Sequence, residues 1–370
     1  MIKIDDTMLD DYLHDESRLS GGAAEGVFLP ENEAEAAGLL REAEERETPV
    51  TISGARTGIA GGAVPCGGIV MATERLAGID RINLDEASGE WRVRLGPAVT
   101  LKTLQTLAGA KIAPGEADPR GLEDFRRDPS RYFFPVDATE TSASVGGMAA
   151  TNASGALSHG YGAMRVHVRA LRVALAGGEI LSPRRGEHTV EAGATMILRT
   201  ESGREIPIPT PTYRPPAVKN TAGLHASSPI DAIDLFLGAE GALGIITQLE
   251  LALARAPEMF FGGLAFFPSE EAAVGFVTTV RDARPAGMEA CRPDALEYFD
   301  AGALRLADRA ENREQLGLPA LPPAGAAVYF EQGCRETEID SLMDAWSAAL
   351  AANGSSIEEV WSALGDRKSV

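Results

Sequence analysis

Cysteine is scarce in this chain: among 370 residues there are three, and Cys66, Cys291 and Cys334 lie far apart. They form no CxxC pair and no cysteine–histidine pattern, so the sequence predicts neither a disulfide framework nor a structural zinc or iron–sulfur site. We expect no bound metal, and we expect Cys66 to be a small buried thiol. Histidine is scarce too, with five residues and no pair at metal-ligand spacing.

Positive charge is also in short supply. The chain has 34 Lys and Arg against 54 Asp and Glu, a formal net charge of -20 at pH 7. Nucleic acids and anionic membrane surfaces require a basic face, so the charge argues against both as partners. The start, MIKIDDTMLDDYLHDE, is acidic and has no apolar core of a signal peptide, and no apolar run is long enough to span a bilayer. We therefore expect a cytoplasmic protein that is not integral to a membrane.

Glycine, in contrast, is abundant, with 40 residues, many of them in three tracts. The tracts are PVTISGARTGIAGGAVPCGG from residue 49, ASVGGMAATNASGALSHGYG from residue 143 and LFLGAEGALGIIT from residue 235. Glycine loses much backbone entropy on folding, so a dense tract indicates a sharp turn or a main chain that lies close against a ligand.

Two well-known phosphate loops are missing from these tracts. Neither the GxxxxGK[ST] pattern nor GxGxxG occurs, which argues against a nucleotide triphosphatase and a nicotinamide dehydrogenase. A strand followed by a glycine-rich loop is still suited to an anion-binding nest of main-chain N–H groups. Three such turns fit an extended dinucleotide contacted mainly by main chain. A long hairpin turn remains the alternative interpretation of the first tract.

The order of predicted elements indicates an α+β protein with a boundary near residue 256. Before it, helices and strands alternate, with a helix at 31–47, a loop at 115–132 and a strand after the third tract. After it we expect a smaller α+β domain with two strands and helices over EEAAVGFVTTVRDA, DALEYFDAGALRLADRA and TEIDSLMDAWSAALAANG. Beyond Gly354 we expect a polar helical stretch and no final strand.

Taken in order, the segments PVTISGARTGIAGGAVP, GGIVMATERLAGI, FFPVDATETSASVGGMAATNASG and LFLGAEGALGIIT resemble the FAD-linked oxidase family. Its FAD-binding domain is of the vanillyl-alcohol oxidase and p-cresol methylhydroxylase (PCMH) type, and the chain most resembles the group of D-lactate dehydrogenases and glycolate oxidase FAD subunits. The resemblance covers roughly residues 25–256. It implies a PCMH-type FAD-binding domain over 1–256, with subdomains at about 20–100 and 101–256. An incomplete, ferredoxin-like α+β substrate or cap domain would follow at 257–370.

The resemblance also implies a set of FAD-binding residues. The first tract matches a pyrophosphate loop, the second runs past the ribityl chain and the isoalloxazine ring, and the third lies beside the flavin. The predicted cofactor residues are Ser53, Gly54, Ala55, Arg56, Thr57, Gly58, Gly61, Gly62, Pro135, Asp137, Ser144, Gly146, Gly147, Asn152, Ala153, Gly155, Tyr161, Gly162, Glu240, Gly241, Gly244 and Ile245.

Several positions depart from the family pattern or carry a specific expectation. Ala239 and Ala242 replace the family's usual Ser and Thr, and Arg56 replaces a small or amide residue, which would add a charge near the phosphates. No histidine lies between residues 49 and 68, so we expect non-covalent FAD. We expect Arg165 to brace the FAD domain, and Met148 and Met164 to be core residues.

The catalytic residues stay unknown at this point. In the resembling group the base and metal ligands are histidines of a late HxGDGNxH-like segment, which does not occur here. His159 lies in a flavin-matched tract, with either a catalytic or a structural and flavin-tuning role. Lys219 and Asn220 match a loop that approaches the flavin, so a substrate role is also open for them.

Three functions remain open. The first is an FAD-dependent oxidoreductase that oxidises a small D-2-hydroxy acid, by hydride transfer to FAD N5, and passes electrons to a separate acceptor such as an iron–sulfur subunit or a quinone. The second is a non-catalytic FAD-binding accessory subunit, or a fragment lacking the cap histidines. The third is a flavin-dependent synthase with an alkyl substrate.

Overall fold

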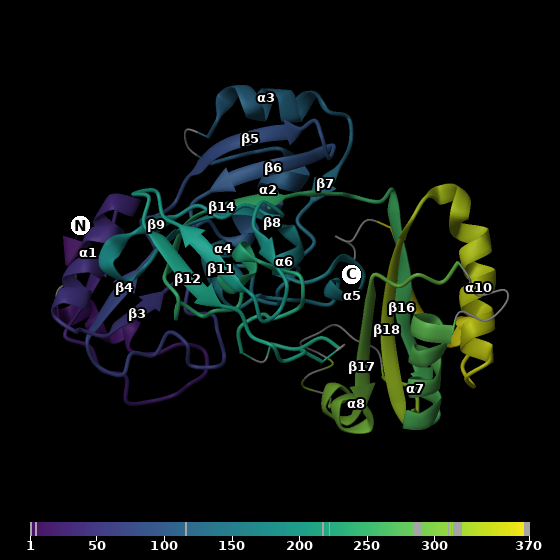
Figure 1. Ribbon diagram of the computed structural model, residues 1–370. Coiled ribbons are helices and arrows are strands. Elements are labelled where there is room, and N and C mark those ends of the chain that lie inside the picture. Colours follow the sequence, from purple (N-terminus) through teal and green to yellow (C-terminus); the bar gives the residue numbers. More distant parts are fainter. Residues whose placement is uncertain are drawn as a thin grey trace. The chain divides into compact units, whose positions relative to one another are not determined.

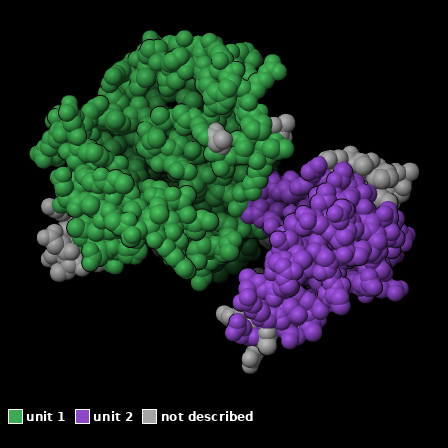
Figure 2. Space-filling view, turned by 90° about the horizontal axis from the view of Figure 1, so that it is seen from below, with its two compact units in different colours: residues 1–154, 163–254 green, residues 155–162, 255–370 purple. Residues whose placement is uncertain are grey.

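The computed structural model describes residues 2–3, 6–114, 117–216, 218–221, 223–283, 290–309, 311, 313 and 320–365. The chain divides into two compact units (Figure 2): residues 1–154 and 163–254 make unit 1, and residues 155–162 and 255–370 make unit 2. Each unit has its own hydrophobic core. In the described segments, no helix combines the length and the apolar character needed to cross a membrane.

Helices and strands are mixed throughout unit 1 (Figure 1). Its helical segments are η1 (Asp6–Tyr12), α1 (Glu33–Glu45), α2 (Leu101–Ala110), α3 (Pro119–Arg127), α4 (Val145–Ala150), α6 (Met164–His167), η2 (Ala176–Gly178) and η3 (Ala232–Leu235). The strands up to the unit boundary are β1 (Ile2–Lys3), β2 (Gly26–Leu29), β3 (Val50–Ser53), β4 (Ile69–Ala72), β5 (Ile79–Asp85), β6 (Glu90–Leu95), β7 (Tyr132–Phe133), β8 (Val168–Ala174), β9 (Ile180–Leu181), β10 (Thr189–Val190), β11 (Thr195–Arg199), β12 (Glu205–Pro209), β13 (Ile230–Asp231), β14 (Ile245–Ala252) and β15 (Ala254–Arg255).

The first sheet of unit 1 has the order β1-β2-β4-β3, and β2 and β3 both run parallel to β4. Helix α1 begins at Asn32, whose side chain accepts a hydrogen bond from the Glu35 N–H, and it buries Leu39 and Leu40 against the sheet. Parallel neighbours need a crossover connection, and between β3 and β4 that connection is the first glycine tract. The topology therefore places this tract at the end of a buried strand.

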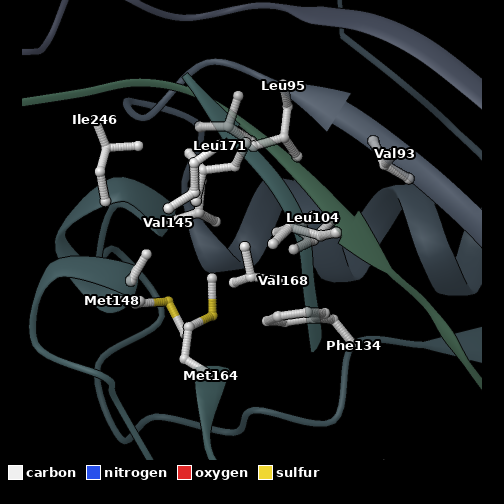
Figure 3. Close-up of a cluster of buried hydrophobic side chains, with 14 of the residues drawn as sticks. Val93, Leu95, Leu104, Phe134, Val145, Met148, Met164, Val168, Leu171 and Ile246 are labelled. Carbon is white, nitrogen blue, oxygen red and sulfur yellow. The ribbon is translucent and has the colours of Figure 1, made fainter. Parts of the chain in front are cut away.

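The second sheet has the order β5-β6-β14-β8-β9, with antiparallel neighbours throughout. Strand β14 lies in its centre and is buried along nearly its whole length. The core around it (Figure 3) includes Met148 from α4 and Met164 from α6, whose side chains lie together among aliphatic neighbours. Both methionines are buried, which confirms the prediction that they are core residues.

The prediction of a loop at 115–132 is wrong for half of that segment, because residues 119–127 form helix α3 against β5 (Figure 1). Asp118 is the N-cap, its side chain accepting from the Gly121 N–H, and Pro119 occupies the first turn. An Asp-Pro step reads equally well as a turn or as a helix start. The helix is stabilised by Leu122 and Phe125, whose side chains are buried in the main core.

The carboxylate of Asp128, just beyond α3, accepts hydrogen bonds from three residues. Trp91 Nε1 and the Tyr132 hydroxyl donate to its Oδ2, and the Ser130 N–H donates to its Oδ1, each at 2.8 Å. Partial burial would raise the pKa of this carboxyl, but the donors outweigh it and hold the pKa far below its ordinary value. The ionised form is therefore the one that the fold stabilises.

We expect Asp128→Asn to lower the free energy of unfolding by about 1–2 kcal/mol at pH 7. A depressed folded-state pKa contributes stability above the unfolded pKa of about 4, and this contribution is lost as the pH falls toward the folded value. The difference between the variant and the parent should therefore shrink below about pH 4. Urea unfolding at a series of pH values measures it, and a difference independent of pH would contradict this account.

Unit 2 is built on one antiparallel sheet of order β17-β18-β16-β19. Its elements are α5 (Ser158–Tyr161), β16 (Met259–Phe267), α7 (Glu270–Thr278), η4 (Thr279–Ala283), β17 (Ala295–Asp300), α8 (Ala301–Ala307), β18 (Ala326–Cys334), η5 (Glu336–Glu338), α10 (Ile339–Ala351), η6 (Ile357–Glu359) and β19 (Trp361–Gly365). Helices α7 and α10 cover the same face of the sheet (Figure 1). Between them and the sheet, the rings of Phe330 and Trp346 stack at 4.3 Å.

Two predictions about unit 2 are wrong. DALEYFDAGALRLADRA was predicted as one helix, but it forms strand β17 up to Asp300 and only then helix α8. Asp300 separates them as the N-cap of α8, accepting a hydrogen bond from the Ala303 N–H. The stretch after Gly354 was predicted to be helical with no final strand, yet it forms the short η6 and then β19, which pairs with β16. Sheet pairing across the chain decided both segments.

Candidate functional site

The first glycine tract leaves β3 as a loop with unusual main-chain angles. Arg56 and Gly61 both have positive φ, 58° and 81°. The left-handed region suits glycine, whereas an L-residue such as arginine costs about 1–2 kcal/mol there. Ile59, at the tip, is 82% exposed, and a Cβ added at Gly58 would meet no atom within 4 Å. The loop is therefore open to whatever binds against it.

The N–H groups of this loop are free over a long run. Within the described part of the chain, the N–H groups from residue 56 to residue 62 donate no hydrogen bond. The groups on either side are engaged: the Ala55 N–H donates to Ser144 Oγ at 3.3 Å, and the Ala63 N–H donates to Asp15 Oδ2 at 3.4 Å. Successive unpaired N–H groups in a loop with left-handed residues form a binding site for an anion.

Ser144 connects the first tract to the second. It is the N-cap of α4, with its Oγ accepting from the Gly147 N–H, and the same oxygen receives the Ala55 N–H. A Cβ at Gly54 would lie 2.7 Å from Ser144 Oγ, so a side chain at that position would push the two tracts apart. Gly146 packs as tightly, because a Cβ there would lie 2.3 Å from Pro97 Cβ.

The third tract meets both of the others. The Gly238 N–H donates to the Ala149 carbonyl at 3.1 Å and the Glu240 N–H to the Ala150 carbonyl at 2.8 Å, which joins it to the end of α4. A Cβ added at Gly241 would lie 3.2 Å from Cγ1 of Ile52 in β3, and one added at Gly62 would lie 3.8 Å from Glu240 Oε2. The three tracts, far apart in sequence, therefore converge in unit 1.

The remaining predicted cofactor residues fall into three groups. Ser53, Thr57, Ala153, Gly244 and Ile245 lie in the converging segments, and Gly244, with φ 139°, opens β14. Pro135 is buried and Asp137 half-buried, in the segment that leads from β7 to α4. Gly155, Tyr161 and Gly162 belong to unit 2, where the neighbouring Gly160 N–H donates to the Asp294 carbonyl.

Arg165 holds the main chain behind the converging tracts. Its guanidinium donates to the carboxylate and carbonyl of Asp234, each at 2.9 Å, and to the Leu237 carbonyl. Its own N–H donates to Oδ1 of Asn152, a left-handed residue at the end of α4. These contacts tie α4 and the third tract together, in agreement with the bracing role predicted for Arg165.

A small pocket lies beside these contacts, and sequence reasoning did not single out all of its residues. It is lined by Thr151, Asn152, Arg165, Pro215, Asn220, Thr221, Gly223, Leu224, His225, Ala226, Gly238 and Glu240. The pKa of His225 is lowered by burial and then by the Arg165 guanidinium, which favours the neutral form of this imidazole. Nothing in its sequence surroundings indicated this place, because the charges around it come from elsewhere in the chain.

The other residues for which the sequence raised an expectation are Lys219, Asn220, His159 and Cys66. Asn220 lines the pocket, whereas Lys219 is exposed. His159 lies in unit 2 on α5, and partial burial and then Arg281 lower its pKa. Cys66 is exposed, so the prediction of a buried thiol is wrong; the loop end that carries it faces solvent. In the described segments, no three His, Cys, Asp or Glu side chains are grouped to hold a metal ion.

The converging tracts fit FAD. The run of free N–H groups suits its two phosphates, and the glycines at 54, 61, 241 and 244, where a Cβ would meet other protein atoms, let the tracts pack closely against neighbouring segments. Residues 24–119 and 127–183 also match the protein family described as "FAD binding domain". This part of the chain is an FAD-binding domain of the FAD-linked oxidase family.

The relatives support the same family. The chain is 29% identical over 304 residues to a D-lactate dehydrogenase of Anaerostipes hadrus, which covers 81% of this chain and 50% of that protein. It is 30% identical over 288 residues to a D-lactate dehydrogenase of Archaeoglobus fulgidus, covering 76% of this chain and 49% of that protein. It is 25% identical over 323 residues to the glycolate oxidase subunit GlcD of Bacillus subtilis, covering 87% of this chain and 54% of that protein. The chain thus spans about half the length of these curated relatives.

The fold is similar to a solved structure of alkyldihydroxyacetonephosphate synthase. The TM-score is 0.59 at 15% sequence identity, and the similarity covers 94% of this chain and 54% of the synthase chain. At this identity the similarity concerns the fold alone, an α+β architecture with a PCMH-type FAD-binding domain.

Proposed function

We propose that the chain belongs to an FAD-dependent oxidoreductase that oxidises a small D-2-hydroxy acid, such as D-lactate or glycolate, with FAD held non-covalently. In this proposal residues 1–256 are the FAD-binding domain and residues 257–370 are part of the substrate domain. Electrons pass to a separate acceptor, for example an iron–sulfur subunit. The substrate class comes from the relatives, since two are D-lactate dehydrogenases and one is a glycolate oxidase subunit.

The observation that carries the proposal is the convergence of the three glycine tracts on one region of unit 1. A hydroxy-acid oxidation needs an acceptor for a hydride, and bound FAD supplies it. The role of this chain is to bind and orient FAD, mainly through main-chain groups. Free N–H groups bind the phosphates, Ser144 and the end of α4 fix the spacing of the tracts, and Arg165 keeps α4 and the third tract together.

Anaerobic titration of the FAD-loaded chain with D-lactate, glycolate and D-2-hydroxyglutarate tests the proposal, with L-lactate as the stereochemical control. We expect at least one of these three substrates to bleach the oxidised flavin spectrum, because electrons that leave the substrate remain on FAD when no acceptor is present. Bleaching by none of them, with FAD bound stoichiometrically, would contradict an oxidase activity of this chain. That result would favour the FAD-binding accessory subunit instead.

A further inference from the structure

Arg56 is an unusual residue for the start of a phosphate-binding loop. It adopts left-handed main-chain angles, with φ 58°, at a place where glycine would be unstrained. Its side chain is only 23% exposed, although the loop tip a few residues on is open to solvent. A strained residue persists where its surroundings hold it, so the contacts of Arg56 are informative.

Two side chains from other segments hold the Arg56 guanidinium. Its Nη1 donates to Oε1 of Glu74, a residue just after β4, at 2.9 Å. Its Cζ lies 4.4 Å from the centre of the Tyr12 ring. The Tyr12 hydroxyl donates to the other carboxylate oxygen, Glu74 Oε2, at 3.1 Å. Tyr12 is itself buried, in a small core with Val27 and Val70. We call Tyr12, Arg56 and Glu74 the latch.

The N-terminal segment that carries Tyr12 also contacts the main chain of the loop. The Glu16 N–H donates to the Arg56 carbonyl at 3.2 Å, and Asp15 Oδ2 accepts from the Ala63 N–H. Asp15 is buried, and its other oxygen accepts from the Ser17 N–H. One of these bonds lies at residue 56, the first of the free N–H run, and the other lies at residue 63, just beyond its last residue. The N-terminal segment therefore fixes both ends of the run without using any of its donors.

We propose that the latch positions the phosphate-binding loop for FAD, and that Tyr12 and Glu74 are positioning residues of the cofactor site. The charge of Arg56 is already paired with Glu74, so the latch acts on the loop's conformation rather than by offering a free cation. A loop that is ordered before FAD binds loses less entropy on binding. The inference concerns the cofactor alone, and it holds whatever substrate the oxidoreductase takes.

Glu74→Gln tests the latch, because it keeps the size of the side chain and removes its charge. We expect FAD and ADP, measured by calorimetry on the apo full-length chain, to bind about tenfold more weakly. Riboflavin has no phosphate, so its binding should not change. The matched control is Glu31→Gln, which breaks a similar pair, Arg75 to Glu31 at 2.7 Å, between residues that are not part of the loop. FAD and ADP affinities equal in the two variants, or an equal loss for riboflavin, would overturn the proposal.

Glu74→Gln could weaken FAD binding by destabilising the whole apo protein, which a thermal midpoint lower than that of Glu31→Gln would reveal. A second variant provides the test in that case. Tyr12→Phe keeps the buried ring and the Arg56–Glu74 pair, and removes only the hydroxyl that holds the carboxylate. We expect a smaller loss of FAD and ADP affinity, about threefold, with riboflavin again unchanged. Unaltered FAD and ADP affinity in this variant would count against the latch.

Discussion

Gly146→Ala is expected to lower the free energy of unfolding by about 1–3 kcal/mol and to weaken FAD binding severely. The new Cβ would lie 2.3 Å from Pro97 Cβ and 3.1 Å from the Pro97 carbonyl oxygen. The Gly146 N–H donates to that same carbonyl at 2.9 Å, so the main chain has no room to yield without losing the bond. Displacement of α4 would also move Ser144, which links it to the first tract.

The control is the same substitution in a neighbouring helix. Gly109 lies in α2, and a Cβ there would meet no atom within 4 Å. Gly109→Ala should therefore raise stability by about 0.5–1 kcal/mol and leave FAD affinity unchanged. Urea unfolding and FAD titration measure both quantities. Full FAD affinity in Gly146→Ala would show that α4 can move without disturbing the cofactor site.

Trp346→Ala is expected to have the largest effect on unit 2, a loss of about 3–5 kcal/mol. Trp346 is fully buried on α10, stacks on Phe330 and lies 6.0 Å from the ring of Phe276. Its Nε1 donates to Gln332 Oε1, which would lose that partner. Removal of the indole thus leaves a cavity and an amide with a broken hydrogen bond.

The measurement is urea unfolding followed by circular dichroism, because the variant also loses a fluorophore. Met343→Ala, on the same helix but 37% exposed, is the control and should change stability by less than about 1 kcal/mol. A loss in Trp346→Ala no larger than in Met343→Ala would mean that α10 is not anchored to its sheet by this aromatic cluster.

The features that sequence predicted well are those that depend on local pattern. Helix α1 follows an Asn cap and an apolar stripe, and β3 is an apolar run that ends in glycines. The three glycine tracts were visible because small residues in such density are costly unless the main chain needs the room. The assignment of Met148 and Met164 to the core was also correct, and both side chains lie in the main hydrophobic cluster of unit 1.

The errors came from segments whose neighbours in space decide their form. Residues 295–300 are strand β17 because they pair with β18, and β19 exists because β16 offers a free edge. The exposure of Cys66 and the surroundings of His225 were equally hidden. A local pattern states what a segment prefers, whereas sheet pairing and burial are set by residues far away in the chain.

By itself, the sequence determined that this protein has glycine-rich turns of the FAD-linked oxidase kind and little basic charge, because composition and spacing are properties of the chain alone. Only the tertiary structure decided that those turns meet, through Ser144, Glu240 and Gly241, and that Arg56 is held by Tyr12 and Glu74. Contacts between distant segments form only when the whole core packs, so no local pattern could specify them.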